Sequence, residues 1–141
     1  MITKEILREN FDYSEDEFFS EDGTHFIGAL IWKNPTNRHA KIIKQHGVAV
    51  AGRWVQHCAK VYCRIALKGK LFYLHRGVWI YHNGDIPDSH EIDHRESNSF
   101  DSRIGSLRCA TKWQNRMNVS GQIYGSSRYV GVSRARYAWL S

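Results

Sequence analysis

The chain contains few cysteines and no long hydrophobic segment. Its three cysteines, Cys58, Cys63 and Cys109, are odd in number and form no Cys-x-x-Cys pair. This pattern disfavours a disulfide framework and a structural zinc knuckle, so we expect buried free thiols in a reducing cytoplasm. No apolar run approaches the roughly 20 residues that cross a bilayer. Residues 1–5 also lack the hydrophobic stretch of a signal peptide, so we expect neither secretion nor a membrane anchor.

Acidic residues are scarce beyond the beginning of the chain. Residues 1–22 have a net charge of −6 and the other 119 residues have a net charge of +12, within a total of +6. A body this basic favours a polyanionic partner, most often nucleic acid, although ordinary solubility is the alternative explanation. The 141 residues, 42% of them hydrophobic, are enough for one folded domain with a core.

The first half of the chain predicts mainly strands. Residues 1–22 are typical of an acidic helix or a loose arm. A run of strand formers predicts a strand over 26–32 before the turn at Asn34-Pro35, and we expect mostly loop over 36–59, where Gly47 and Gly52 interrupt any long helix. Apolar alternation then predicts a hairpin of strands 61–67 and 71–74.

The second half predicts short elements of both kinds. Helical spacing indicates a short helix from His75 to His82 that ends near Asn83-Gly84, and a turn at 87–89 precedes a strand over 90–93. After a polar loop over 95–105, a strand over 107–109 returns. Thr111-x-x-Gln114 forms a capping box, which predicts a helix from about 112 to 118. The fold class we expect is α+β.

Three residues in this second half form a pattern suited to phosphodiester chemistry. Asp93 and Asn115 are 22 positions apart, on a strand end and on the capped helix, so a hairpin and helix that fold together would bring both to one divalent cation. Carboxylate and amide oxygens suit Mg²⁺, whose coordination phosphate and water complete. His94 stands beside them, and a neutral imidazole takes a proton from water near pH 7.

The stretch from His75 to Asn118 resembles the ββα-metal motif of HNH endonucleases, in the subgroup common among phage-encoded and intron-encoded homing enzymes. The resemblance covers most of residues 24–118, with an N-terminal strand and β-hairpin platform before the motif. It implies that His94 is the general base, that Asp93 and Asn115 bind Mg²⁺ or another divalent cation such as Mn²⁺, and that double-stranded DNA is the substrate. The matching residues, in order, are His75-Arg76, Trp79, Gly84, Pro87, Ile92-Asp93-His94, Asn98, Leu107-Arg108, Thr111 and Asn115-x-x-Asn118.

One position departs from the pattern. The family usually has an asparagine just before Leu-Arg, which braces the loop and helps to orient the base, and here that position is Ser106. We assign an orienting role to Ser106, Asn98 and Asn118. DNA contacts are predicted for a set of mostly basic residues around the motif: His75, Arg76, Arg95, Arg108, Lys112 and Arg116. Two alternatives stay open, because His75 also fits a core position and Asn115 also fits a plain helix position.

This interpretation divides the chain into an acidic arm (1–22), a nuclease domain (23–119) and a linker with a partial DNA-binding hairpin (120–141). Within the last segment, residues 127–133 resemble the first hairpin of an ethylene-response-type DNA-binding domain. One active site cuts one strand, so we expect a nicking monomer. The rivals are a catalytically weak DNA-binding protein that keeps the fold, and a nuclease that acts on RNA.

Overall fold

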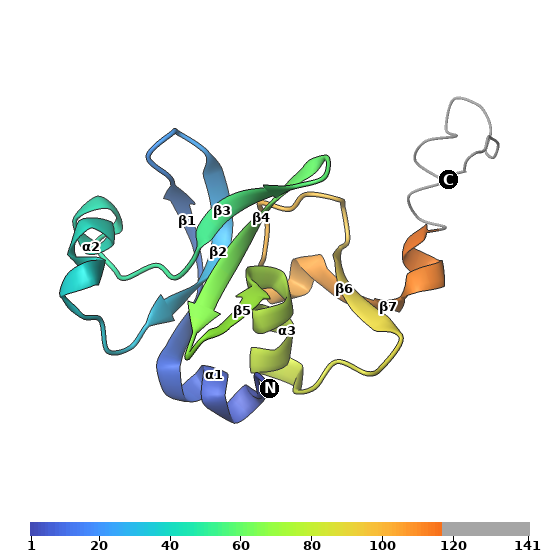
Figure 1. Cartoon of the computed structure of the whole chain (residues 1–141). Helices are drawn as coiled ribbons and strands as arrows, with labels where there is room; N and C mark the ends of the chain where they lie inside the picture. Colours follow the sequence, from blue (N-terminus) through green and yellow to red (C-terminus); the bar gives the residue numbers. More distant parts are fainter. Residues whose placement is uncertain (117–141) are drawn as a thin grey trace. The chain divides into compact units, whose positions relative to one another are not determined.

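The structure is a computed structural model that describes residues 1–116, so the predictions for Asn118 and for residues 120–141 lie outside the described residues (Figure 1). Short helices separate runs of two or three strands that pair antiparallel, which confirms the α+β class. The chain divides into two units, which are described separately. The first contains residues 1–86 and 92–108, and the second contains residues 87–91 and the chain from residue 109 onward.

The first unit begins with helix α1 (Lys4–Asn10) and the hairpin of strands β1 (Phe11–Phe19) and β2 (His25–Trp32). The prediction of a helix or loose arm is therefore right for α1 and wrong for β1, which pairs with β2 along its length apart from an irregularity between Ser14 and Glu17. Charges in the middle of β1 obscured the strand. They occupy exposed positions, whereas Phe11 and Phe18, near its two ends, are buried.

The prediction of a loop over residues 36–59 is wrong. This segment contains a 3-10 turn η1 (Asn37–His39), helix α2 (Ala40–His46) and strand β3 (Arg53–His57). Gly47 does end the helix, because it adopts a left-handed φ of +82° and its amide donates to the Ile43 carbonyl at 2.7 Å. The helix nevertheless forms over the seven residues that precede Gly47.

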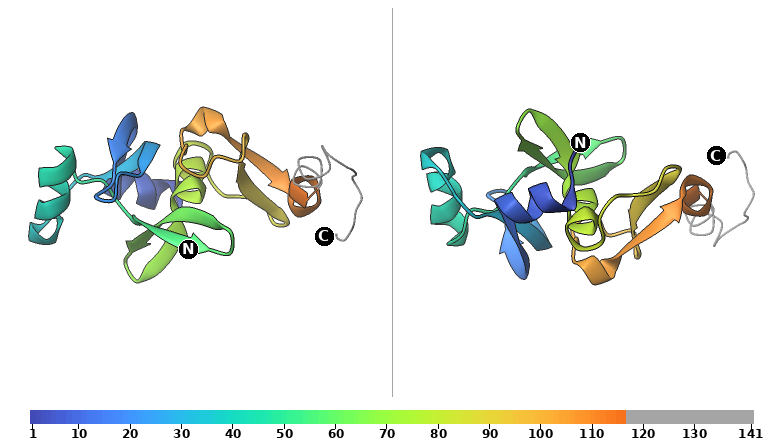
Figure 2. Two further views of the ribbon diagram at one scale, coloured as in Figure 1. Left: turned by 90° about the horizontal axis from the view of Figure 1, so that it is seen from above. Right: turned by 90° about the horizontal axis from the view of Figure 1, so that it is seen from below.

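Strands β4 (Lys60–Leu67) and β5 (Lys70–Tyr73) form the predicted hairpin and join β3 in a sheet of order β3-β4-β5 (Figure 2). The predicted short helix is α3 (Leu74–Asn83), which contacts α1, β2, β4 and β5. A Cβ added at Gly77 would lie 2.7 Å from the Phe72 ring, so the helix packs closely on β5. The largest fully buried side chains come from α1, β1, β2, β4, α3 and β7: Leu7, Phe11, Leu30, Ile65, Leu74, Val78 and Leu107.

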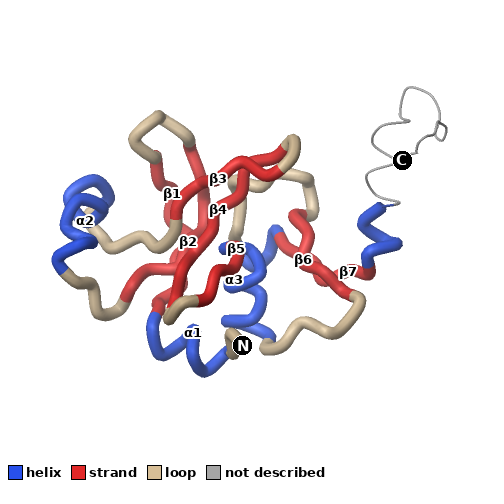
Figure 3. The backbone as a smooth tube through the Cα atoms, viewed as in Figure 1, coloured by secondary structure: helices blue, strands red, loops and turns tan. Residues whose placement is uncertain are grey.

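Strands β6 (His90–His94) and β7 (Leu107–Thr111) pair as predicted, and each runs from one unit into the other. Between them the chain forms a long loop and a 3-10 turn η2 (Ile104–Ser106) (Figure 3). The loop binds the edge of β2, because the Ile27 amide donates to the Phe100 carbonyl at 2.8 Å and the Ser102 amide donates to the Ile27 carbonyl at 2.9 Å.

The second unit contains the predicted turn at 87–89 and the start of the predicted helix. The capping box is confirmed: the Gln114 amide donates to the Thr111 hydroxyl at 3.1 Å, and the Thr111 amide donates to Gln114 Oε1 at 2.8 Å. Residues 112–116 are helical. Across residues 1–116, no helix has the length and apolar character that crossing a membrane requires.

Candidate active site

His94 lies at the end of β6 and is 6% exposed. Its Nε2 atom is buried and has no hydrogen-bond partner within residues 1–116. Burial lowers the pKa of the imidazole to about 4, and the nearby carboxylates of Asp93 and Asp101 offset only part of this effect. His94 is therefore neutral at neutral pH, which is the protonation state that a proton acceptor needs.

Aromatic rings surround His94 on one side. The ring of His75, the second residue of α3, has its centroid 4.7 Å from the His94 ring, and the Tyr62 ring of β4 lies 6.3 Å away. His75 also stacks on Tyr73 at 5.8 Å. It is 9% exposed, and burial lowers its pKa to about 3. A buried neutral ring in contact with His94 matches the core alternative for His75 better than a cationic phosphate contact.

Asp93 precedes His94, and its carboxylate is partly exposed. Arg108 of β7 holds it through an ion pair of 3.5 Å between Nε and Oδ2. The structure thus brings two sequence-predicted residues together in a way that the sequence did not indicate. The Asp93 carboxylate, which precedes the candidate base, therefore compensates part of the positive charge of Arg108.

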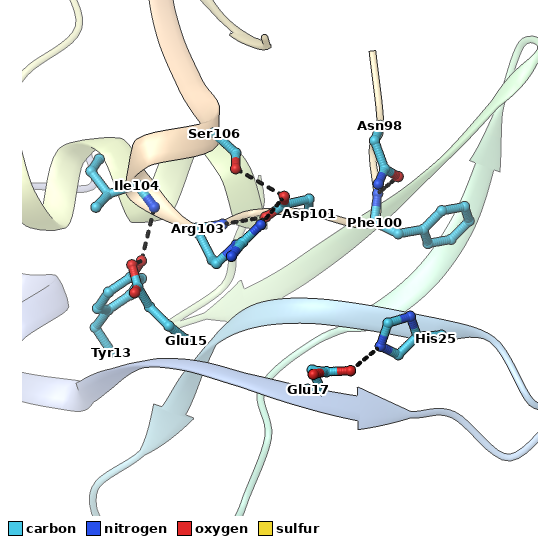
Figure 4. Close-up of polar contacts among 10 residues, drawn as sticks. All are labelled: Tyr13, Glu15, Glu17, His25, Asn98, Phe100, Asp101, Arg103, Ile104 and Ser106. Carbon is cyan, nitrogen blue, oxygen red and sulfur yellow. Dashed lines mark hydrogen bonds and ion pairs between the residues drawn. The ribbon is translucent and has the colours of Figure 1, made fainter. Parts of the chain in front are cut away.

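A polar pocket of about 180 Å³ adjoins His94, and Asn98, Asp101, Arg103 and Ser106 are among its lining residues. Asn98 closes a turn there, since its Oδ1 accepts from the Phe100 amide at 3.1 Å. The Ser106 hydroxyl donates to Asp101 Oδ2 at 2.9 Å, and Arg103 forms two side-chain hydrogen bonds to the same carboxylate (Figure 4). The walls of the pocket are therefore fixed by their own hydrogen bonds.

Asn115 lies in the second unit, on the helix that begins after the Thr111 cap. Its Nδ2 donates to Glu91 Oε1 at 2.7 Å. Glu91 is a residue of β6, the strand that also carries Asp93. Because the amide nitrogen is engaged with a carboxylate, any metal bound by Asn115 would be bound through the amide oxygen.

The other basic residues predicted to contact DNA are more exposed than His75. Arg76 is half-buried on α3, and Arg95 is exposed, with its Nε donating to the Leu107 carbonyl at 3.1 Å. Lys112 and Arg116 are exposed on the helical residues of the second unit. All four carry charge at positions that solvent reaches.

The sequence does not predict four residues of the site, which are Tyr13, Tyr62, Asp101 and Arg103. Asp101 falls within the predicted polar loop over 95–105, where an aspartate two positions before an arginine is a weak signal for a local ion pair. Tyr13 gave no signal. Its hydroxyl accepts a hydrogen bond from the Ile104 amide at 2.8 Å, across 91 positions of sequence.

Comparison with known proteins gives a family match for the segment that contains His75, Asp93, His94 and Asp101. Residues 72–117 match the family model described as HNH endonuclease, a stretch that begins in β5 and includes α3, β6 and β7. Neither the curated proteins nor the solved structures provide a match to the chain. A match to this family indicates nuclease activity on a nucleic acid. Residues 72–117, which contain His94 and its neighbours His75 and Asp93, are therefore similar to the HNH endonuclease family.

Proposed function

We propose that this protein is a divalent-metal-dependent DNA endonuclease of the homing-enzyme type, with His94 as its general base. The observation that carries the proposal is a buried, neutral imidazole at a strand end, directly after an aspartate and inside the segment that matches the HNH family. The net charge of +12 over residues 23–141 favours a polyanionic substrate for this site.

His94 accepts a proton from the attacking water in this proposal. Its contact with His75 limits how the ring can rotate, and the neutral state set by burial leaves a ring nitrogen able to accept the proton. Arg95 and Arg76, which solvent reaches, bind backbone phosphates and hold the scissile strand near the base. Asn98 and Ser106 stabilise the conformation of the loop after β6 through their hydrogen bonds.

The proposed metal ligands are Asp93 and Asn115. Asp93 fits, because its carboxylate is a hard oxygen donor that is 23% exposed and is oriented by Arg108. Asn115 fits through its amide oxygen, with its nitrogen held by Glu91. No group of three or more His, Cys, Asp or Glu side chains forms a metal site within residues 1–116, and the proposed site is of another kind, with one carboxylate and one amide. When bound, Mg²⁺ or Mn²⁺ would stabilise the charge that develops on the phosphate and on the leaving oxygen.

The proposal includes the remaining features expected from the sequence. One such site cuts one strand, so a monomer nicks the duplex and a double-strand break requires two copies. The low cysteine content and the lack of paired spacing favour action in a reducing cytoplasm, that of the host cell if the gene belongs to a phage.

The test is a nicking assay on supercoiled plasmid with Mg²⁺, with and without EDTA. We expect the wild-type protein to produce open circles only when metal is available, and His94→Ala to lose at least about 100-fold in rate, since removal of a general base costs this much. Asp93→Asn and Asn115→Ala should lose activity to a similar degree. The matched control is His57→Ala, which removes an exposed imidazole from β3 and should retain wild-type activity.

Two results would contradict the proposal. If the protein binds duplex DNA but never nicks it, and His94→Ala changes nothing, the chain is a DNA-binding protein that keeps the fold. If labelled RNA is cut faster than duplex and single-stranded DNA of the same sequence, the substrate is RNA. Size-exclusion chromatography with light scattering measures the molar mass in solution and so tests whether the protein is a monomer.

A further inference from the structure

Asp101 lies in the middle of the loop between β6 and β7, and its carboxylate accepts four hydrogen bonds. Arg103 donates three of them, from Nε at 2.9 Å, from Nη2 at 2.7 Å and from its backbone amide at 3.2 Å. The Ser106 hydroxyl donates the fourth at 2.9 Å (Figure 4). A carboxylate offers about four acceptor sites, so these bonds use its capacity. Asp101 therefore has no acceptor site left for a substrate proton or a metal ion.

The partner of this carboxylate, Ser106, is connected to the residue after His94. The Arg95 amide donates to the Ser106 carbonyl at 2.8 Å, which closes the loop at its base. The carbonyl of the same peptide group, that of His94, accepts from the Ser97 amide at 2.9 Å. The backbone on the C-terminal side of the candidate base is thus held by a serine whose side chain is fixed by Asp101.

The loop is also held from outside. The Tyr13 hydroxyl of β1 accepts from the Ile104 amide, and the loop binds Ile27 of β2 on either side of Asp101. The Asp101 side chain is only 16% exposed. A charged group with this little exposure stabilises a loop only when it is fully paired, so loss of its partners would loosen the loop.

We propose that Asp101 is a positioning residue, which fixes Ser106 and through it the backbone that follows His94, so that the imidazole keeps the orientation needed for proton transfer. The inference rests on the proposed endonuclease function. In this proposal Asp101, Arg103 and Ser106 hold the loop together. The Ser106 side chain is short, and it acts through its hydrogen bond to the Asp101 carboxylate.

The test compares Asp101→Ala, Asp101→Asn, Ser106→Ala and the double variant Asp101→Ala/Ser106→Ala in the nicking assay. We expect Asp101→Ala to lower kcat about 10- to 100-fold, the scale set by a small misplacement of a reacting group, with KM for DNA nearly unchanged. Asp101→Asn should lose less, because its amide oxygen still accepts from Ser106. The double variant should lose no more than Asp101→Ala, since both changes remove the same contact. The matched control is Asp85→Asn, at an exposed aspartate.

A second readout does not depend on activity. Amide hydrogen exchange should become faster at Arg95 and Ser97 in Asp101→Ala and stay unchanged in β4 and β5. Wild-type kcat or unchanged exchange at Arg95 and Ser97 in Asp101→Ala would overturn the proposal, as would faster exchange throughout both Asp101→Ala and the milder Asp101→Asn. If the wild-type protein does not nick DNA, the proposed function fails, and the exchange measurement alone then decides whether Asp101 orders the backbone beside His94.

Discussion

At the scale of single residues, two buried histidines in contact distinguish this site. His75 and His94 are each less than 10% exposed, and their rings are 4.7 Å apart. Protonation of either ring would place a cation in a poorly solvated position next to another imidazole. Burial is therefore the main reason why the pKa of each is lowered, to about 3 for His75 and about 4 for His94.

This burial predicts that the protein loses stability in mild acid. Below pH 6.5 the unfolded chain binds a proton at His75 that the folded protein excludes until about pH 3, so the free energy of unfolding falls as the pH falls through that window. The cost is about 2 kcal/mol per such histidine between pH 7.5 and pH 5. Denaturant unfolding at pH 7.5, 6 and 5 measures it.

The informative variant is His75→Phe, which keeps a ring in contact with Tyr73 and removes the proton-binding group. Its free energy of unfolding should depend less steeply on pH than that of the wild type. His57→Gln, at an exposed position, should keep the wild-type slope. Equal slopes for the wild type and His75→Phe would show that His75 is solvated in the folded protein.

At the scale of elements, the position of the loop before β7 depends on a glycine in β2. Gly28 has a left-handed φ of +87°, and a Cβ there would lie 2.7 Å from the Arg103 amide nitrogen and 2.8 Å from the Ser102 carbonyl carbon. Both are backbone atoms, which cannot rotate away. Any side chain at position 28 would therefore push the loop that holds Asp101 away from β2.

Gly28→Ala tests this contact, and Gly23→Ala is its control. Gly23 has almost the same φ, +88°, with nothing within 4 Å of its added Cβ. Gly23→Ala should cost about 1–2 kcal/mol from backbone strain alone, whereas Gly28→Ala should cost at least about 2 kcal/mol more because of the overlap. Chemical denaturation measures both, and equal losses would mean that the loop is not packed on β2.

How well the elements could be predicted depended on how much of the signal is local. The β4–β5 hairpin and the Thr111 cap were predicted correctly, because apolar alternation and helix capping depend on residues that are close together in the sequence. Strand β1 was missed, because its many acidic residues disfavour a strand by themselves and only pairing with β2 stabilises it. Helix α2 is not predicted by the sequence, because a glycine either interrupts a long helix or ends a short one, and Gly47 ends α2.

At the scale of the whole molecule, the candidate site depends on contacts between distant parts of the sequence. The Asp93-His94 pair could be recognised from the sequence because the family pattern is local and dense. The contacts of His94 with His75 and of Ile104 with Tyr13 could not, because they join elements that the tertiary fold brings together. The sequence therefore predicts candidate reacting groups, and the structure adds the residues that contact them.

The distribution of charge over the whole chain predicts how DNA binding responds to salt. The net charge of −6 over residues 1–22 opposes the net charge of +12 over the rest, and the acidic residues of β1 lie mostly at exposed positions. This acidic segment should repel DNA. The triple variant Asp12→Asn/Asp16→Asn/Glu21→Gln should therefore bind a short duplex roughly 2- to 10-fold more tightly than the wild type near 50 mM salt.

Fluorescence anisotropy at rising salt concentrations checks this expectation. The advantage of the triple variant should shrink toward 200 mM salt, because exposed charges separated by more than a Debye length are then largely screened. Binding of both proteins should weaken steeply over the same range, since phosphate contacts release counterions. Lys41→Gln/Lys44→Gln, which removes two exposed positive charges from α2, is the control of opposite sign and should weaken binding at low salt. If the triple variant instead bound DNA more weakly than the wild type, the acidic residues of the β1–β2 hairpin would take part in recognition rather than oppose it.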